Sequence, residues 1–210
     1  MKVEAINFTK SLGNTIVLEN INVLLKSGNI YGVIGKNGSG KTMFLRMISG
    51  LILPTSGEVK VDDKVLGKDM SFPKHLGILL ERPSFLPHLT GYENLKMLAK
   101  IRKIANEKDI QAFMNLFNLD WESDKKFRKY SLGMKQKLGI IQAIMENQQI
   151  IVLDEPFNAL DENSVETLRH TLIKLKTEQK LIVMTSHNKE DIELLCDYTF
   201  LISEGKLMNT

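Results

Sequence analysis

A glycine-rich segment at residues 35–42 constrains the fold of this chain more than any other feature. It reads GKNGSGKT and fits the pattern G-x-x-x-x-G-K-[ST]. An apolar run at residues 30–34 precedes the segment and predicts a buried strand, and residues 41–51 follow it with the apolar spacing of a helix. This order of strand, glycine-rich turn and helix predicts an α/β fold with a phosphate-binding loop.

The residue types of this loop suit an anionic phosphate. Glycines allow positive φ angles, so that successive backbone N–H groups turn toward phosphate oxygens. The Lys41 ammonium can reach the β- and γ-phosphates of a nucleotide, and the Thr42 hydroxyl can ligate Mg²⁺. The helix that follows points its partly positive N-terminus at the same anion. The predicted binding residues are Gly35, Asn37, Gly38, Ser39, Gly40, Lys41 and Thr42.

The rest of the chain separates into three stretches by pattern. The first is rich in β-branched and apolar residues, with strands predicted at 3–8 and 16–25, a turn at 13–14 between them and a hairpin at 58–66. From about residue 90 to 145 the spacing is helical, and Thr90 with Glu93 fits a helix-capping box. The last third alternates, with strands predicted at 150–153, 181–185 and 198–202 and helices at 162–177 and 189–196. This alternation predicts a mostly parallel sheet covered on both faces.

Two adjacent carboxylates, Asp154 and Glu155, follow the predicted strand at residues 150–153. A strand buried on both faces cannot hold charges inside the sheet, so we expect both at its carboxyl end, where ligands bind in open α/β sheets. There Asp154 can hold Mg²⁺ through water, and Glu155 can orient or deprotonate an attacking water. A solvated turn explains such a pair equally well by itself, but the upstream phosphate loop favours the functional interpretation.

Composition limits the class of protein without choosing a function. The 210 residues are 43% hydrophobic, enough for the core of one compact domain, and the formal net charge of +3 is too small to indicate a nucleic-acid partner. The single cysteine, Cys196, excludes an intramolecular disulfide. No apolar run approaches the roughly 20 residues that span a bilayer, so a role at the membrane would require a partner.

The segment YSLGMKQK at residues 130–137 separates this chain from other proteins with a phosphate loop. It resembles the ABC signature, usually written LSGGQ: Ser131 and Gly133 match the serine and the second glycine, and Leu132 replaces the first glycine. The segment also precedes the acidic strand end, as it does in ABC proteins. Over essentially its whole length the chain resembles the nucleotide-binding domain of ABC transporters, and it is most similar to the bacitracin and lantibiotic resistance branch.

The resemblance implies a P-loop NTPase core with a mostly parallel sheet, an N-terminal antiparallel β subdomain and an inserted helical subdomain. The helical subdomain is expected at about residues 86–146, within a single ABC-type domain that spans residues 1–210. The resemblance also implies a head-to-tail dimer, in which Ser131, Gly133 and the nearby Gln136 meet the nucleotide of the opposite subunit at a helix N-terminus.

Three further positions acquire roles only through the resemblance. Asp161 corresponds to the D-loop at the dimer interface, and His187 to the switch histidine that contacts the γ-phosphate. Glu81 stands where the family usually has the glutamine of the Q-loop, near Mg²⁺ and the attacking water. The expected catalytic residues are then Glu155, His187 and Lys41, and the expected metal ligands are Thr42, Asp154 and Glu81.

Two positions depart from the common family pattern. Leu12 occupies the position of an aromatic ring that stacks on adenine. Because leucine lacks a π-system, we expect modest ATP affinity and little preference for ATP over GTP. Glu81 adds a negative charge beside the metal that glutamine lacks, so hydrolysis should depend more strongly on Mg²⁺.

The implied function is that of an ATP-binding, ATP-hydrolysing subunit at the inner, cytoplasmic face of the cell membrane, with ATP and Mg²⁺ as cofactors. It would power a membrane permease, docked at residues 82–86, that exports peptide antibiotics or similar compounds. A second nucleotide-binding subunit, as a homodimer on ATP binding, would be its other partner, and no nucleic acid is expected.

Two alternatives remain open. One is a soluble ABC-family ATPase that is not coupled to transport, and the other is a regulatory module that binds nucleotide but barely hydrolyses it. The long coiled-coil insertion of repair members and the tandem cassettes of translation members do not occur in these residues, which disfavours the first. Glu155 and His187 argue against the second.

Overall fold

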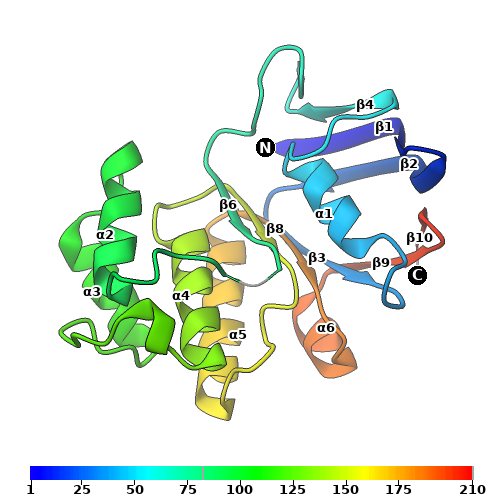
Figure 1. The fold of residues 1–210 in the computed structure, drawn as a ribbon. Helices are drawn as coiled ribbons and strands as arrows, with labels where there is room; N and C mark the ends of the chain where they lie inside the picture. Colours follow the sequence, from blue (N-terminus) through cyan, green and yellow to red (C-terminus); the bar gives the residue numbers. More distant parts are fainter. Residues whose placement is uncertain (82, 210) are drawn as a thin grey trace.

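The computed structural model describes residues 1–81 and 83–209 as two β-sheets with helices between and beside them (Figure 1). The N-terminal sheet is antiparallel and has the order β2-β1-β4-β5. Its strands are β1 (Lys2–Leu12), β2 (Thr15–Lys26), β4 (Ser56–Val61) and β5 (Lys64–Val65). The two hairpins predicted in this stretch are therefore confirmed, with longer strands in the first.

The second sheet is mostly parallel, as the alternation of strands and helices predicts. Its order is β10-β9-β3-β8-β7-β6, and of the described strands only β10 runs antiparallel to its neighbour. Its strands are β3 (Asn29–Ile34), β6 (Leu76–Leu79), β7 (Ile150–Leu153), β8 (Leu181–Thr185), β9 (Tyr198–Ser203) and β10 (Lys206–Asn209). Because the parallel strands share one direction, the segments that follow β3, β6, β7 and β8 emerge at the same edge of the sheet.

Helices cover both faces of the second sheet. In Figure 1, α1 lies between the two sheets, and the other helices lie on the opposite face of the second sheet and beyond it. The α-helices are α1 (Lys41–Ile48), α2 (Gly91–Arg102), α3 (Glu107–Leu116), α4 (Leu132–Ile144), α5 (Glu162–Thr177) and α6 (Lys189–Leu195). The helices α2, α3 and α4 lie in the sequence between β6 and β7, as expected for an inserted helical subdomain. Together with the two sheets they confirm the predicted fold class.

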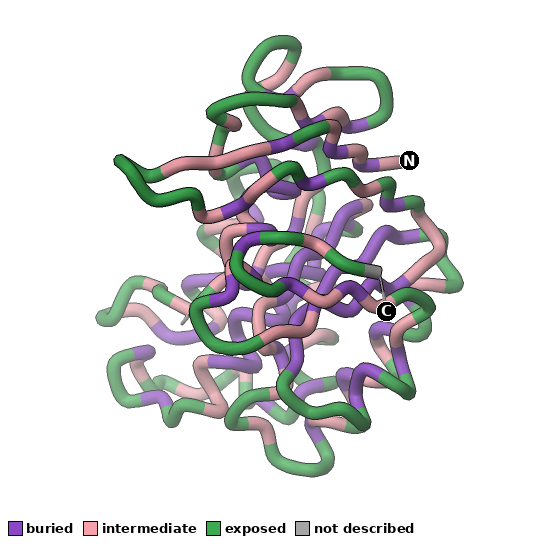
Figure 2. The backbone as a smooth tube through the Cα atoms, turned by 90° about the vertical axis from the view of Figure 1, so that its right-hand side faces the viewer, coloured by how far each residue is buried: buried purple, intermediate pink, exposed green. Residues whose placement is uncertain are grey.

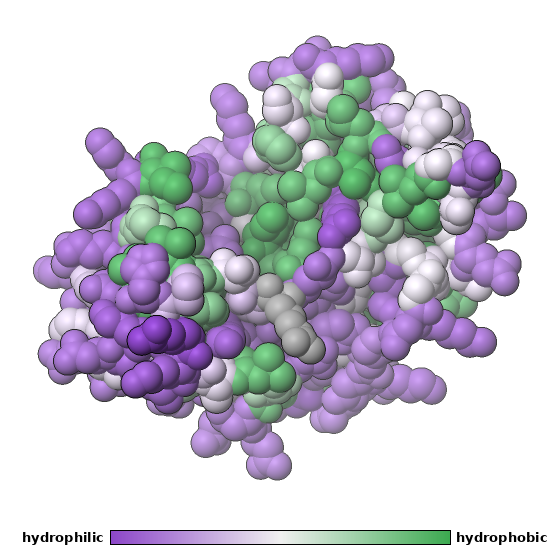
Figure 3. Space-filling view, viewed as in Figure 1, coloured by the Kyte–Doolittle hydropathy of each residue, from purple (hydrophilic) through white to green (hydrophobic). Residues whose placement is uncertain are grey.

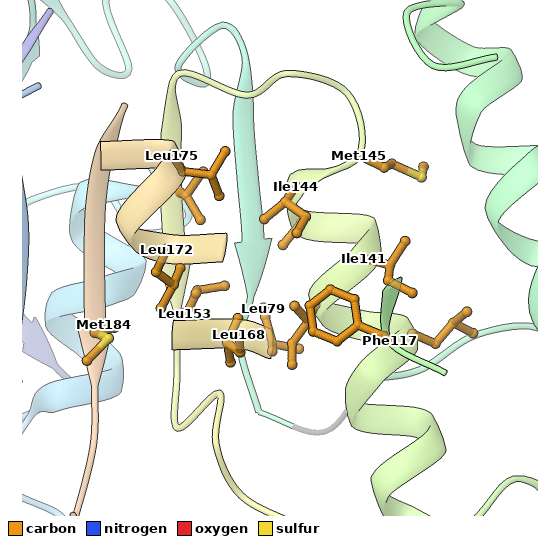
Figure 4. Packing of buried hydrophobic residues seen from close by; sticks show 14 of the residues in the cluster. Leu79, Phe117, Ile141, Ile144, Met145, Leu153, Leu168, Leu172, Leu175 and Met184 are labelled. Carbon is orange, nitrogen blue, oxygen red and sulfur yellow. The ribbon is translucent and has the colours of Figure 1, made fainter. Parts of the chain in front are cut away.

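Two apolar cores hold these layers together. Ile150 and Val152 of β7 belong to the core around α1, whereas Ile151 and Leu153 belong to the core formed with α4 and α5. Successive side chains of a strand point to opposite faces, so β7 is apolar on both sides and fully buried. Figure 2 shows buried chain concentrated at the centre of the molecule, and Figure 4 shows leucines of α5 packed beside Leu153.

The structure differs from the prediction at two places. The helix after the phosphate loop ends at Ile48 rather than at residue 51, because Gly50 has a left-handed φ of 72° that ends the helical path. Strand β6 was not predicted, since it has only four residues and contains Gly77. That glycine is required by packing: a Cβ atom there would lie 1.8 Å from the carbonyl oxygen of Ala143 in α4.

Candidate nucleotide site

A cavity of about 1100 Å³ opens at the edge of the second sheet where β6, β7 and β8 end. The loop between β3 and α1 forms one wall, and the segment after β7 forms another. Most of the predicted site residues line it: Asn37, Gly38, Ser39, Gly40, Lys41, Thr42, Glu81, Gln136, Asp154, Glu155 and His187. Segments more than 100 residues apart in the sequence thus meet at the carboxyl ends of the parallel strands, where the sequence predicts the site.

The phosphate loop has the backbone that its glycines predict. Gly40 caps the N-terminus of α1 with a φ of 114°. Gly35 has a φ of 151°, and a Cβ atom there would lie 2.3 Å from the carbonyl oxygen of Ile202, so no larger residue fits. The buried Lys41 ammonium donates to the carbonyl oxygens of Gly35, at 2.8 Å, and Lys36, at 3.2 Å. These bonds hold a cation against the loop where an anion would bind.

Thr42 and Asp154 bring two oxygen donors together. The Thr42 hydroxyl donates to Oδ2 of Asp154 at 2.8 Å. Within residues 1–81 and 83–209, no group of three His, Cys, Asp or Glu side chains could hold a metal by itself. Mg²⁺ prefers oxygen ligands and is bound through one or two carboxylates together with substrate phosphates. The pair therefore fits a Mg²⁺ ion shared with a nucleotide rather than one caged by protein.

Thr185, at the end of β8, contacts the carboxylate of Asp154 and the backbone of Glu155, and sequence reasoning missed it. Its hydroxyl donates to Oδ1 of Asp154 at 2.6 Å and accepts the backbone N–H of Glu155 at 2.8 Å. The register explains the contact, because Leu153 of β7 pairs with Met184 of β8. Asp154 follows Leu153 and Thr185 follows Met184, so these two residues also lie side by side. The sequence signal was a polar residue closing an apolar run.

Glu155 and His187 contact each other in the wall of the cavity. Oε1 of Glu155 lies 3.2 Å from Nε2 of His187, and Oε2 accepts the backbone N–H of His187 at 3.2 Å. The Glu155 side chain is 18% exposed. Burial raises the pKa of this carboxyl above its ordinary value, and the neighbouring His187 opposes that rise. A carboxylate with a raised pKa in a cleft suits proton transfer.

The signature segment begins α4. Ser131 is the N-cap of this helix, and its hydroxyl accepts the backbone N–H of Met134 at 3.2 Å. Gly133 packs so closely that an added Cβ atom would lie 2.6 Å from the carbonyl oxygen of Ala159. Leu132 is 56% exposed and lines the cavity, whereas Ser131 and Gly133 are not among the described residues that line it. Their predicted contact with the nucleotide of an opposite subunit stays a prediction.

Glu81 and Asp161 both carry ion pairs. Glu81 follows β6 with a left-handed φ of 58°, lines the cavity and pairs with Arg46 of α1. Asp161 caps α5 and pairs with Lys137 of α4 at 2.8 Å, and this hydrogen-bonded partner lowers the pKa of the Asp161 carboxyl. Asp161 is not among the described lining residues.

Leu12 does not line the described cavity. It ends β1 with its side chain 53% exposed, and the wall at this end of the cavity is formed by Thr15, Ile16 and Val17 of β2. Ile16 pairs with Ser11 across the hairpin and is 52% exposed. An aliphatic side chain thus borders the cavity, but it comes from the strand after the predicted position.

Comparison with known proteins decides the family. A family model described as "ABC transporter" matches residues 18–158. The chain belongs to the ABC transporter family. This ABC protein is 45% identical over 205 residues to the uncharacterized ABC transporter ATP-binding protein YybJ of Bacillus subtilis (strain 168), a match that covers 98% of this chain and 94% of YybJ.

A second relative agrees with the predicted branch of the family. The ABC protein is 38% identical over 208 residues to the bacitracin transport ATP-binding protein BcrA of Enterococcus faecalis, covering 98% of this chain and 68% of BcrA. Its fold matches a solved dimeric bacterial ABC transporter cassette, MJ0796, with a TM-score of 0.87 and 26% identity over 99% of this chain and 97% of that one. The chain is therefore an ABC ATP-binding subunit and an ATPase. Across residues 1–81 and 83–209, the helices are too short or too polar to cross a membrane.

Proposed function

We propose that this ABC ATPase powers a membrane permease that exports peptide antibiotics or similar compounds, at the cytoplasmic face of the membrane. The observation that carries the proposal is a surface we call the apolar face: the side chains of Leu51, Phe72, Leu86 and Met97, between 39% and 55% exposed. A groove of about 840 Å³ is lined by Leu51, Leu86 and Met97. Leu51 also lines a second, smaller cavity together with Phe72. Figure 3 shows hydrophobic side chains gathered near the centre of the side of the molecule that faces the viewer.

The position of the apolar face suits a partner that responds to nucleotide. A contiguous exposed apolar patch is typical of a protein interface. Glu81 lines both the nucleotide cavity and the groove, so a partner in the groove would lie next to the bound nucleotide. Of the docking segment expected at residues 82–86, the last four residues line the groove, and Arg82 lies outside the described residues. Phe85 also packs edge-on against Phe127 at 5.2 Å, so it serves the fold as well.

The relative BcrA supports the proposed cargo. Its name gives it a role in bacitracin transport, and the match extends over 98% of this chain. We further propose that residues 1–210 work as one ABC-type domain, with residues 86–146 as its helical subdomain. The dimeric cassette MJ0796 supports pairing of two such subunits.

For hydrolysis we propose in-line attack of water on the γ-phosphate of ATP. Glu155 would accept the proton of the water, and His187 would hold the γ-phosphate. Lys41 would neutralise charge on the phosphates. Thr42 and Asp154 would hold Mg²⁺ with Glu81 nearby, and the bound ion would neutralise further charge. Ser131, Gly133 and Asp161 would complete the site of the opposite subunit.

Glu155→Gln tests the catalytic assignment. We expect ATP binding to be retained and the hydrolysis rate to fall about 10²- to 10⁴-fold, the usual contribution of a general base. Steady-state phosphate release and equilibrium binding of ATP would be measured on the same preparation. Turnover at the wild-type rate would remove Glu155 from the role of base.

Affinity purification from detergent-solubilised membranes tests the transport proposal. We expect a membrane protein with several spans to co-purify in fixed ratio. Phe72→Asp or Met97→Asp should abolish its recovery, while both variants keep the ATPase activity of the isolated chain. Ile173→Asp is the control, since Ile173 is a 46% exposed isoleucine of α5 outside the apolar face. Recovery of only soluble proteins or nucleic acid would favour the uncoupled ATPase instead.

A further inference from the structure

Gln136 of α4 makes two hydrogen bonds to the turn that carries Glu155. Its side-chain amide nitrogen donates to the carbonyl oxygens of Glu155 and Pro156, each at 3.1 Å. Both partners only accept, so the amide nitrogen rather than the amide oxygen must face them. Gln136 is 7% exposed, and its donors are therefore committed to this turn rather than free for a ligand.

The turn needs such support. Glu155 has a φ of 49°, in the left-handed region that side chains with a Cβ atom rarely adopt. Strained backbone of this kind persists only where the surroundings fix it. The Thr185 hydroxyl accepts the N–H of Glu155. The carbonyl oxygen of Glu155 accepts from the Gln136 amide and from the N–H of Asn158. Gln136 is the side chain that fixes the carbonyl end.

Two neighbours of Gln136 on α4 seat the helix on the same segment. Gly133 lies against the carbonyl of Ala159, and Lys137 pairs with Asp161 at 2.8 Å. The start of α4 and residues 155–161 thus share contacts on either side of Gln136. The helix can therefore act as the rigid support against which the glutamine holds the turn.

We propose that Gln136 is a positioning residue, which holds the strained backbone at Glu155 so that the carboxylate faces His187 and the cavity. This inference rests on the proposed role of Glu155 as the base. Removal of the amide takes the side-chain donor from the carbonyls of Glu155 and Pro156 and leaves the Glu155 carbonyl with the N–H of Asn158, which lets the turn relax. The carboxylate would then shift relative to the reacting atoms, while the phosphate loop stays in place.

The test compares Gln136→Met with Gln148→Met in the full chain. We expect Gln136→Met to lower kcat about 10- to 100-fold, since a misplacement on the order of 1 Å costs about 10²-fold. KM for ATP and equilibrium binding of ATP should change less than about threefold, because Gln136 would act on the reaction step and not on binding. Gln148→Met is the matched control: Gln148 is also buried, and its amide oxygen accepts the backbone N–H of Glu146 at 3.0 Å, away from Glu155.

Two further variants keep the outcome interpretable. Gln136→Glu retains the size of the side chain but an ionised carboxylate cannot donate, so it should reproduce the loss of kcat even if the methionine variant folds poorly. In a Glu155→Gln background, Gln136→Met should cause little further loss, because the group that it positions is gone.

The possible results separate the two proposals. A kcat within about twofold of wild type for both Gln136 variants, or an equal loss for Gln148→Met, overturns the positioning role. If Glu155→Gln itself hydrolyses ATP normally, the assignment of the base fails and the positioning role fails with it. A slow Glu155→Gln enzyme beside normal Gln136 variants overturns only the role of Gln136.

Discussion

Glu146 is a buried carboxylate just after α4, at the opposite end of that helix from Gln136. Its side chain is 9% exposed, and Oε2 lies 3.7 Å from Nη1 of Arg102. Arg102 also lies 2.9 Å from Nδ1 of His75. Burial raises the pKa of Glu146 above its ordinary value of 4.5, and Arg102 opposes that rise. The ionised carboxylate is thus less favourable in the folded chain than in the unfolded one.

Glu146→Gln should stabilise the protein at neutral and higher pH. The protonated carboxyl stabilises the folded state below the unfolded pKa, and this contribution is lost as the pH rises through the raised folded pKa. A glutamine has no charge to lose, so the gain in melting temperature over wild type should be largest near pH 8 and smallest near pH 5. Thermal unfolding across this range measures it, with the exposed Glu193→Gln as control. A gain independent of pH would contradict the assignment.

At the scale of elements, the start of α2 was predictable from local sequence. The Thr90 hydroxyl accepts the backbone N–H of Glu93 at 3.1 Å, and the Glu93 carboxylate accepts the N–H of Thr90 at 2.6 Å, which confirms the capping box. Asn106 and Asp109 form a second capping box at α3 that was not predicted.

Thr90→Ala should lower the free energy of unfolding by about 0.5–2 kcal/mol, the usual cost of removing an N-cap oxygen. Denaturant unfolding would measure the change. Thr167→Ala serves as control, because Thr167 lies within α5, where its hydroxyl bonds the carbonyl of Asn163 and alanine is a better helix former. A loss at Thr167 as large as at Thr90 would argue against a specific capping effect.

Local sequence patterns predicted the helices and strands well, but they predicted poorly which distant residues contact one another. The bounds of β7, α5 and β8 agree with the prediction because each is a clear apolar run or helical repeat. Site residues within one motif, such as Lys41 and Thr42, follow from that motif. Thr185 and Arg46 could not be found in the same way, since their partners Asp154 and Glu81 depend on which strands and helices become adjacent. The position of Leu12 could not be predicted for the same reason. The pairing of β1 with β2 places Ile16 of β2, and not Leu12 of β1, at the border of the cavity.

For the molecule as a whole, Glu81 lies where two cavities meet. It lines the nucleotide cavity and the groove of the apolar face, and its pair with Arg46 ties it to α1, the helix that begins at the phosphate loop. The pair also offsets part of the negative charge that distinguishes Glu81 from glutamine. A change in the position of the Glu81 carboxylate would therefore alter both the nucleotide cavity and the groove of the apolar face.

The order of the second sheet has a consequence for synthesis of the chain on the ribosome. Strand β3, which carries the phosphate loop, has β8 and β9 as its neighbours in the sheet. Strand β8 begins at Leu181 and β9 at Tyr198, whereas β3 ends at Ile34, so β3 remains without its hydrogen-bonding partners while the middle of the chain emerges. Loops of this length make pairing slow and leave apolar strands exposed. Because Glu204 and Gly205 also line the cavity, the nucleotide site is complete only after translation has passed β9.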